Sequence, residues 1–289
     1  MYTIENDILK VTVKSKGAEL DSIYNKQTGI EYMWNGDPAF WGKKSPVLFP
    51  IVGELKSQTY FYQDKSYSLS RHGFAREMEF VLTAQTTNSI TLTLSSNEAT
   101  KEKYPFDFVF SLIYKITGNQ LSVTYSVKNA GQHEMYFSVG GHPAFKVPIT
   151  NDTAYNEYYL EFDQPESAGR WPISKDGLIE KSPVSLLDKS SKIALSKQLF
   201  FSDAIVFKNL KSGKVNLLND KNEKGLAFDF HEFPFLGIWA AKNADFICIE
   251  PWCGIADSVD SDQQLIHKEG INQLSAGDLF ERSWVVKVF

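Results

Sequence analysis

Two short motifs place a histidine and a glutamate where each could exchange a proton with a bound substrate. The first is Gly140-Gly141-His142-Pro143. Its glycines allow close approach of the backbone to another group, and Pro143 holds His142 in an extended conformation. An imidazole titrates near neutral pH, so it suits general acid–base chemistry. The alternative is a packed histidine at the end of a strand.

The second motif is Ile249-Glu250-Pro251-Trp252, which continues an apolar run that begins at Phe246. A carboxylate in such a run is costly to bury unless it is paired or functional. Because proline cannot donate to a sheet ladder, we expect hydrogen bonding to end at Pro251 and Glu250 to emerge at the rim of a cleft. That position suits a general base, and the alternative is a structural ion pair.

Two further polar segments carry candidate site residues. The segment 71–76 reads Arg-His-Gly-Phe-Ala-Arg and places His72 before a glycine and between two arginines. Asp203 lies between an aromatic pair and an expected strand. Taken alone, the first segment predicts a surface turn and Asp203 a turn aspartate.

These motifs lie among segments whose apolar and polar residues alternate, which predicts strands. The expected strands are 8–14, 90–94, 106–116, 121–127, 158–162, 204–207, 215–218, 226–230, 246–250 and 283–288. Gly118-Asn119 predicts a tight hairpin turn. Helical patterns are confined to 98–104 and 262–268, and the irregular stretch 164–192 is expected to loop over a sheet edge. Many short strands without a βαβ rhythm predict an all-β sandwich or barrel, and the lack of a linker or repeat predicts one domain over residues 1–289.

Composition excludes several classes of protein. Apolar residues make up 43% and charged residues 22%, as in soluble globular chains. With a net charge of −5 and no lysine or arginine run, nucleic acid is not an expected partner. No apolar stretch reaches the ~20 residues of a membrane span. The N-terminus lacks signal-peptide features, and Cys248 and Cys253 form neither a disulfide framework nor a zinc motif, so we expect a cytoplasmic protein.

Taken in order, six segments resemble the aldose 1-epimerase (galactose mutarotase-like) family, and its LacX-like branch in particular. They are 48–53 (Leu-Phe-Pro-Ile-Val-Gly), 71–76, 141–145 (Gly-His-Pro-Ala-Phe), 203–204 (Asp-Ala), 235–239 (Phe-Leu-Gly-Ile-Trp) and 249–252. The resemblance spans nearly the whole chain. It implies a large two-sheet antiparallel β-sandwich with few short helices and an open sugar cleft on one face.

The resemblance also implies roles in anomer interconversion. Glu250 would be the general base that takes the proton of the anomeric hydroxyl, and His142 the general acid that protonates the ring oxygen. His72 would help to hold or polarise that oxygen, and Asp203 would bind sugar hydroxyls. Opening a cyclic hemiacetal requires one proton removed and one delivered, which a carboxylate and an imidazole can do in turn.

Further implied substrate contacts are Arg71 and Arg76, with Trp239 and Phe74 as stacking walls. No cofactor or metal is expected. The expected partner is a small-molecule sugar, and the expected assembly is a monomer or homodimer.

One departure from the family pattern concerns the tract after Phe49-Pro50. Family members usually carry an arginine there, whereas this chain reads Gly-Glu-Leu-Lys from 53 to 56, with Glu54 at the arginine's place. Lys56, Arg71 or Arg76 could substitute, although lysine lacks the guanidinium's bidentate fork. The substrate could be an aldohexose or a hexose phosphate. A phosphorylated sugar would need a basic pocket near its C6, which Arg71 and Arg76 could supply.

Two other functions stay open at this stage. One is a non-catalytic carbohydrate-binding or sensing module on the same fold. The other is a glycoside hydrolase or lyase, which would need two carboxylates such as Glu250 and Asp203 and would leave the histidine pair unexplained.

Overall fold

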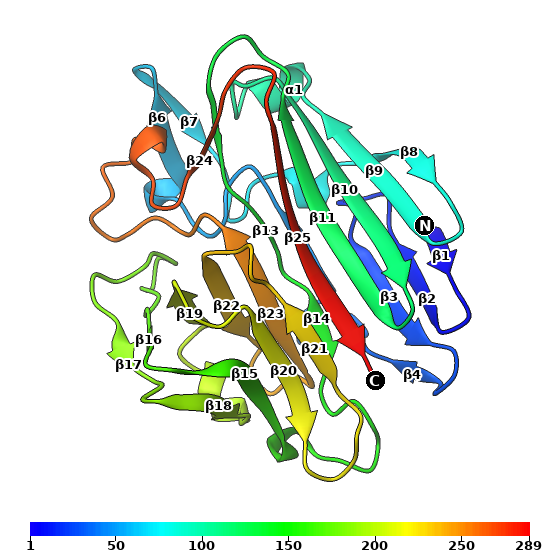
Figure 1. Cartoon of the computed structure of the whole chain (residues 1–289). Helices are drawn as coiled ribbons and strands as arrows, with labels where there is room; N and C mark the ends of the chain where they lie inside the picture. The colour runs from blue at the N-terminus through cyan, green and yellow to red at the C-terminus, as the bar shows by residue number, and fades with distance from the viewer.

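The computed structural model describes residues 1–289, and its regular elements are almost all antiparallel strands (Figure 1). The largest sheet has nine strands, in the spatial order β18 (Ser190–Ala194), β15 (Tyr158–Glu166), β20 (Lys214–Asn219), β21 (Leu226–Asp229), β25 (Leu279–Val288), β11 (Gln120–Asn129), β10 (Phe108–Thr117), β9 (Ser89–Ser95) and β8 (Val81–Gln85). The predicted turn at Gly118-Asn119 joins β10 to β11, and Thr117 pairs with Gln120.

Two smaller sheets lie behind the nine-stranded sheet in Figure 1. One has the order β19 (Ile205–Lys208), β22 (Phe235–Trp239), β23 (Phe246–Cys253), β13 (Val139–Gly141) and β5 (Val47–Leu48), with β14 (Ala144–Lys146) as a second partner of β23. The other has the order β1 (Tyr2–Glu5), β2 (Leu9–Val13), β3 (Leu20–Asn25) and β4 (Ile30–Glu31).

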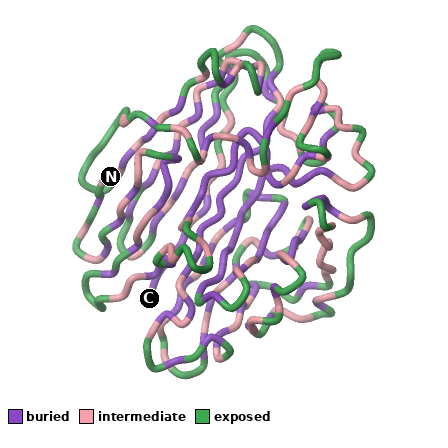
Figure 2. The backbone as a smooth tube through the Cα atoms, turned by 180° about the vertical axis from the view of Figure 1, so that it is seen from behind, coloured by how far each residue is buried: buried purple, intermediate pink, exposed green.

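The core lies between these layers. In β10 every second residue from 108 to 116 is buried, as the alternating pattern requires. Phe110 stacks on Phe49 with ring centroids 4.6 Å apart, and Phe228 of β21 lies 5.9 Å from Phe145 of β14. The nine-stranded sheet therefore packs on the smaller ones as a β-sandwich. Figure 2 shows buried residues along the strands and exposed ones in the connections.

The remaining elements are short. They are the strand pairs β6 (Thr59–Tyr62) with β7 (Lys65–Ser68), β12 (Met135–Phe137) with β24 (Asn272–Leu274) and β16 (Gly169–Arg170) with β17 (Val184–Ser185), the α-helix α1 (Glu98–Lys101), and the 3-10 turns η1 (Lys56–Gln58), η2 (Ala75–Glu77), η3 (Tyr155–Glu157), η4 (Lys197–Phe200) and η5 (Leu265–His267). None of these helices has the length and apolar character needed to cross a membrane.

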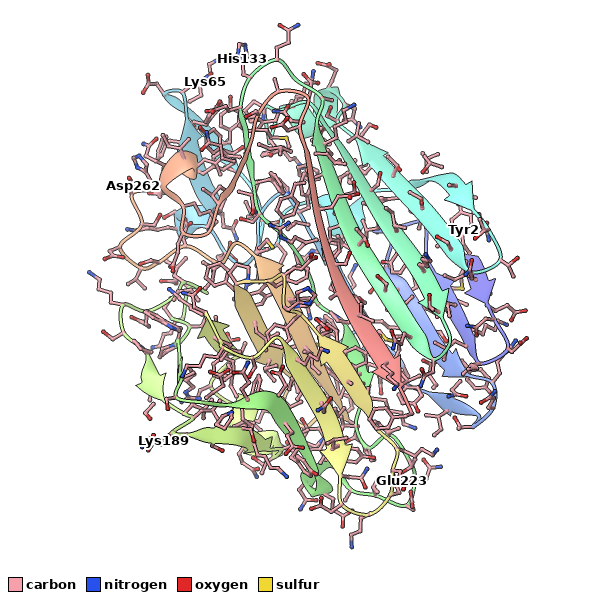
Figure 3. All side chains as sticks on the ribbon, viewed as in Figure 1. Tyr2, Lys65, His133, Lys189, Glu223 and Asp262 are labelled. Carbon is pink, nitrogen blue, oxygen red and sulfur yellow. The ribbon has the colours of Figure 1, made fainter.

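All ten predicted strands are present, with ends that differ by a few residues. The two predicted helices are shorter: 98–104 reduces to the single turn α1, and 262–268 holds only η5. The stretch 164–192 does run along a sheet edge, where the Trp171 amide donates to the Val206 carbonyl of the edge strand β19 at 2.8 Å. Figure 3 shows exposed side chains such as Lys189 and Glu223 at the periphery of the ribbon.

Candidate active site

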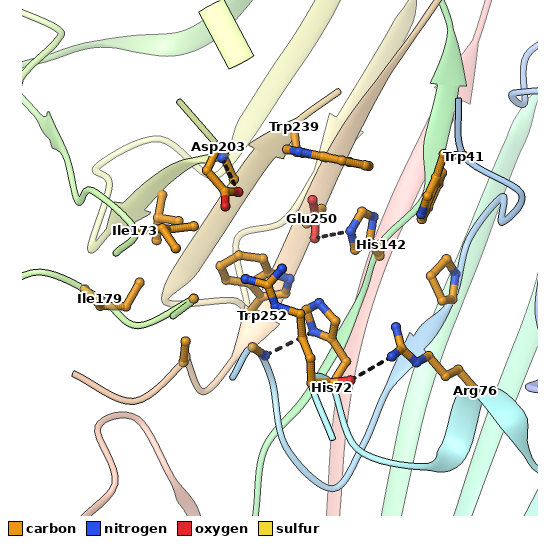
Figure 4. A pocket seen from close by; sticks show the side chains of 17 residues that line it. Trp41, His72, Arg76, His142, Ile173, Ile179, Asp203, Trp239, Glu250 and Trp252 are labelled. Atoms are coloured by element: carbon orange, nitrogen blue, oxygen red, sulfur yellow. Dashed lines mark hydrogen bonds and ion pairs between the residues drawn. The ribbon is translucent and has the colours of Figure 1, made fainter. Parts of the chain in front are cut away.

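One pocket brings together residues from all four polar segments (Figure 4). Its volume is about 460 Å³, within the range of small-molecule sites (about 300–1,000 Å³). The lining residues are Trp41, Pro46, Gly53, Arg71, His72, Arg76, His142, Ile173, Gly177, Ile179, Asp203, Ala204, Val206, Trp239, Glu250, Trp252 and Ala256. The segments are far apart in sequence, so the fold itself assembles this site.

His142 lies between β13 and β14, directly after the two glycines. Both glycines are required because a side chain would clash with its neighbours. A Cβ on Gly141 would lie 2.2 Å from the hydroxyl oxygen of Tyr125, and a Cβ on Gly140 would lie 2.7 Å from the Trp252 ring. The sheet can therefore pack this closely behind His142 only because both residues lack a side chain.

Glu250 lies in the middle of β23 and is only 2% exposed, so it forms the floor of the pocket and not its rim. The prediction that hydrogen bonding ends at Pro251 is wrong, because β23 continues to Cys253 and Pro251 pairs in register with Leu236. The amide of Ile249 donates to the Pro143 carbonyl at 3.2 Å. Pro251 is two residues after Ile249, so its nitrogen points to the same side of β23. On that side β14 has ended and β13 has not yet begun to pair with β23, so no carbonyl there needs a donor from Pro251.

His142 and Glu250 form a contact pair. Nε2 of His142 lies 3.3 Å from Oε2 of Glu250. Trp41 stacks on the imidazole with centroids 4.9 Å apart, and Trp239 meets it edge-on at 5.5 Å. The two aromatic rings cover the imidazole on two sides and restrict the orientation of its plane.

Burial sets the acidity of this pair. It raises the pKa of Glu250 well above its ordinary value; the charge of Asp203 adds to this shift, and Arg71 and Trp252 oppose it. Burial also lowers the pKa of His142 to about 3. Since the two groups are in contact, they titrate as a unit that holds one proton over the range between these limits. Such a pair can both accept and donate a proton.

His72 lies near His142, with ring centroids 5.8 Å apart. Its backbone φ is +67°, and the following Gly73 is required because a Cβ there would lie 2.3 Å from the Phe49 carbonyl oxygen. Nδ1 of His72 accepts a hydrogen bond from the Gly53 amide at 3.0 Å. Burial, followed by the charges of His142 and the arginines, lowers the pKa of His72 well below its ordinary value. The ring is therefore a neutral imidazole whose Nε2–H is the donor.

Both predicted arginines line the pocket. Arg76 donates through Nη2 to the Arg71 carbonyl at 2.8 Å, and Nε of Arg71 lies 3.8 Å from Oε2 of Glu54. Glu54 therefore pairs with one of the two cations. Lys56 does not line the pocket; its Nζ donates to the Ser261 carbonyl at 3.0 Å.

Asp203 and Trp239 lie on the side of the pocket away from Arg76 (Figure 4). Asp203 has a φ of +85°, and its Oδ1 accepts from the Ala204 amide at 2.7 Å. The prediction that Phe74 forms a stacking wall of the site is wrong, because Phe74 does not line the pocket. It packs on Phe49, with centroids 6.3 Å apart, as part of the aromatic core.

Sequence reasoning missed several lining residues. Trp41 precedes β5 in a segment without a catalytic motif, and Ile173, Gly177 and Ile179 belong to the stretch that was read only as a loop. Trp252 was visible as part of the Glu-Pro-Trp motif. Its separation of two residues from Glu250 puts both side chains on one face of a strand, and this spacing could have identified it.

One cluster has the elements of a metal site. His142, Cys248 and Glu250 offer a nitrogen, a sulfur and an oxygen that all lie within 4.8 Å of one another. A cysteine ligand must be ionised, yet burial and the charge of Glu250 raise the pKa of Cys248 well above its ordinary value. Without a cation the thiol is therefore neutral, and His142 and Glu250 are left as a proton-transfer pair.

Comparison with known proteins agrees with this architecture. The sequence profile of the family described as Aldose 1-epimerase matches residues 1–265. The chromosomal protein LacX of Lactococcus lactis subsp. lactis is 32% identical over 294 residues, which cover 99% of this chain and 98% of that protein.

Two solved structures share the fold along their whole length. A galactose mutarotase related enzyme from Lactobacillus acidophilus has a TM-score of 0.94 and 38% identity, covering 100% of this chain and 97% of its own. A galactose mutarotase-like protein from Lactobacillus casei has a TM-score of 0.92 and 30% identity, covering all of both chains. The galactose mutarotase-like β-sandwich expected from the sequence is thus confirmed.

Proposed function

Because the chain belongs to the aldose 1-epimerase family, we propose that it interconverts the α and β anomers of an aldohexose by acid–base ring opening. The observation that carries the proposal is the buried contact of 3.3 Å between His142 and Glu250 at the floor of a sugar-sized pocket. No other residue pair in the pocket joins an imidazole to a carboxylate.

The reaction uses the single proton of the pair. The shifted pKa values place the resting proton on Glu250, and its transfer to His142 gives a carboxylate and an imidazolium. In that form Glu250 accepts the proton of the anomeric hydroxyl and the carbonyl forms. The bond from the anomeric carbon to the ring oxygen breaks, its electron pair stays on that oxygen, and His142 donates its proton there. The open aldehyde rotates and closes on its other face with the roles reversed.

Other residues of the pocket hold the sugar. The neutral Nε2–H of His72 would donate to the ring oxygen, since its Nδ1 already accepts from Gly53. Asp203 would accept from sugar hydroxyls. Trp239 and Trp41, which flank the imidazole, would contact the apolar face of the ring.

The balance of charge favours a free aldose over a sugar phosphate. Arg71 and Arg76 are the cations of the pocket, and Glu54 at 3.8 Å pairs with the first of them. Asp203 and Glu250 add acidic groups. A phosphate dianion would therefore meet one unpaired arginine and nearby carboxylates, which is a poor anion site.

The cellular setting follows from the same proposal. Both cysteines are unpaired and buried, as suits a reducing compartment, and we propose a cytoplasmic enzyme that acts as a monomer or homodimer.

The test is polarimetry on freshly dissolved α-D-glucose and α-D-galactose with wild-type protein, Glu250→Gln and His142→Asn. We expect wild type to speed the approach to anomeric equilibrium, and each substitution to reduce the rate by ~10²–10⁴-fold. Sugar binding by calorimetry should remain. His267→Asn is the matched control, since His267 forms an exposed pair with Asp262 outside the pocket and its loss should not alter the rate.

Hexose 6-phosphates are tested by NMR exchange between anomers. Faster exchange with phosphates than with free sugars would contradict the proposed preference for a free aldose. Binding of sugars without any acceleration would contradict the enzymatic function and favour a sugar-binding module on this fold.

A further inference from the structure

Trp252 carries a hydrogen-bond donor that the mechanism above does not use. The residue is 6% exposed and lines the pocket, yet its indole Nε1 is buried without a hydrogen-bond partner. Two other buried indoles are satisfied: Trp34 donates to the Trp41 carbonyl at 2.8 Å and Trp284 to the Tyr125 hydroxyl at 2.8 Å. Since buried indole N–H groups normally find an acceptor, the exception at the pocket points to an acceptor on the ligand.

The ring position is fixed by two glycines on the neighbouring strands. Gly140 of β13 pairs in register with Trp252, and a Cβ there would lie 2.7 Å from the ring. A Cβ on Gly237 of β22 would lie 2.5 Å from the far edge of the ring. Both glycines belong to motifs noted in the sequence, and together they form a slot for a flat indole. A side chain held in such a slot directs its N–H in one direction.

Trp252 shares a face of β23 with Glu250, because the two residues are two positions apart. Figure 4 shows the indole beside Glu250 and near His72, at the centre of the pocket. Trp252 lowers the pKa of Glu250 by hydrogen bonding toward the carboxylate. The indole N–H therefore faces Glu250, although no acceptor lies within full hydrogen-bond distance of it. An oxygen atom that gives its proton to Glu250 would therefore lie close to the indole N–H.

We propose that the Trp252 indole N–H donates a hydrogen bond to the anomeric oxygen of the sugar and stabilises the negative charge that develops there as Glu250 removes its proton. This inference rests on the proposed mutarotase function. During ring opening the anomeric oxygen changes from a hydroxyl to a carbonyl, and its charge is most negative between these states. A fixed donor in a dry pocket stabilises that charge more than it stabilises the neutral ground state.

The test removes the N–H and keeps the shape of the ring. Two replacements are used: Trp252→Phe, and substitution of the Trp252 indole by benzothiophene, in which sulfur takes the place of the N–H. We expect kcat for mutarotation of the preferred sugar to fall by ~10²-fold, while KM stays within about threefold of wild type. Trp284→Phe is the comparison for stability, since it also removes a buried indole N–H, one that donates to the Tyr125 hydroxyl and does not line the pocket.

The outcomes separate this inference from the function on which it rests. Active wild type with kcat unchanged in the benzothiophene variant would overturn the role of Trp252 alone. A loss confined to KM would also overturn it, because it would place the contact in the ground state. Wild type without mutarotase activity would overturn both the function and this role. If Trp252→Phe fails to fold, the isosteric benzothiophene variant decides.

Discussion

The imidazole of His142 and the carboxylate of Glu250 lie 3.3 Å apart, and the two residues are only 9% and 2% exposed. Burial disfavours the charged form of each group, so neither can ionise alone at low cost. One proton shared between them leaves the pair neutral in total, which reconciles two ionisable groups with an apolar site. The same arrangement provides the proton acceptor and the proton donor that ring opening needs.

The first prediction concerns the pH profile. The pair is active while it holds one proton, and it gains a second only near the lowered pKa of His142, about 3. Activity should therefore stay constant between about pH 5 and 7, where an ordinary histidine would titrate with a pKa of ~6.5. The loss at high pH should come when the pair gives up its proton, above the ordinary range of a glutamate. NMR exchange of anomers, corrected for the spontaneous rate, measures this; an acid limb centred near ~6.5 would contradict it.

The second prediction concerns stability. The folded-state pKa of Glu250 is raised, so above a pH of ~4.3 the unfolded chain releases a proton that the folded chain retains. Protonated Glu250 therefore contributes fully to the free energy of unfolding at low pH. This contribution is lost as the pH rises from the unfolded-state pKa through the folded-state pKa. Glu250→Gln removes this loss and should raise Tm at pH 7 by about 2–4 °C, for ~1 kcal/mol in a chain of this size.

Calorimetry at two pH values separates this effect from a general change in packing. At about pH 4 the Tm difference between Glu250→Gln and wild type should become small, because the carboxyl is then mostly protonated in the unfolded chain as well as in the folded one. Glu281→Gln, at an exposed position of β25, should have no effect at either pH. A lower Tm of Glu250→Gln at pH 7 would refute the prediction.

Local patterns in the sequence were enough to predict the long strands but not the short ones. A strand such as β10 shows its alternation over ten residues, whereas β5 has two residues and β13 and β14 have three each. These short strands are fixed by their neighbours in the sheet. Pro251 illustrates the same limit, since its missing donor is harmless only because its nitrogen faces the break between β13 and β14.

The residues of the candidate site also divide into those with a local sequence signal and those placed by tertiary packing. His142, Glu250, His72 and Asp203 stand in motifs with unusual local chemistry, so they could be selected from the sequence, and all four line the pocket. Phe74 stands in such a motif as well, yet its ring packs against Phe49 of the aromatic core. Trp41 has no local signal, because its place against His142 comes from tertiary packing alone.

The third prediction concerns Gly237. Its added Cβ would lie 2.5 Å from the Trp252 ring, so Gly237→Ala should displace the indole and cost about 1–3 kcal/mol through overpacking. A shift of the ring next to Glu250 should also lower kcat by roughly 10–100-fold. Gly42→Ala is the control, because its Cβ meets only Pro38 at 3.8 Å. Wild-type activity in a folded Gly237→Ala protein would show that the slot does not position the indole.

The last prediction concerns the wall of the pocket behind Gly53 and Ala256. Nζ of Lys268 lies 2.6 Å from Oδ1 of Asp257, and the two side chains are 2% and 3% exposed. The second oxygen of Asp257 accepts from the Lys56 amide at 3.0 Å, so this pair joins the segments that carry Gly53 and Ala256.

Lys268→Met would leave the Asp257 carboxylate buried without its cation. Breaking a buried pair in this way costs about 3–5 kcal/mol, so the urea midpoint should fall clearly, and KM for the sugar should rise as the wall loosens. Lys181→Met removes the partner of Asp260 in a pair whose side chains are 64% and 55% exposed, and should change stability by less than ~0.5 kcal/mol. A buried charge that loses its partner has no water to replace it, whereas an exposed charge does. Equal urea midpoints for the two variants would therefore mean that the buried pair does not stabilise this wall of the pocket.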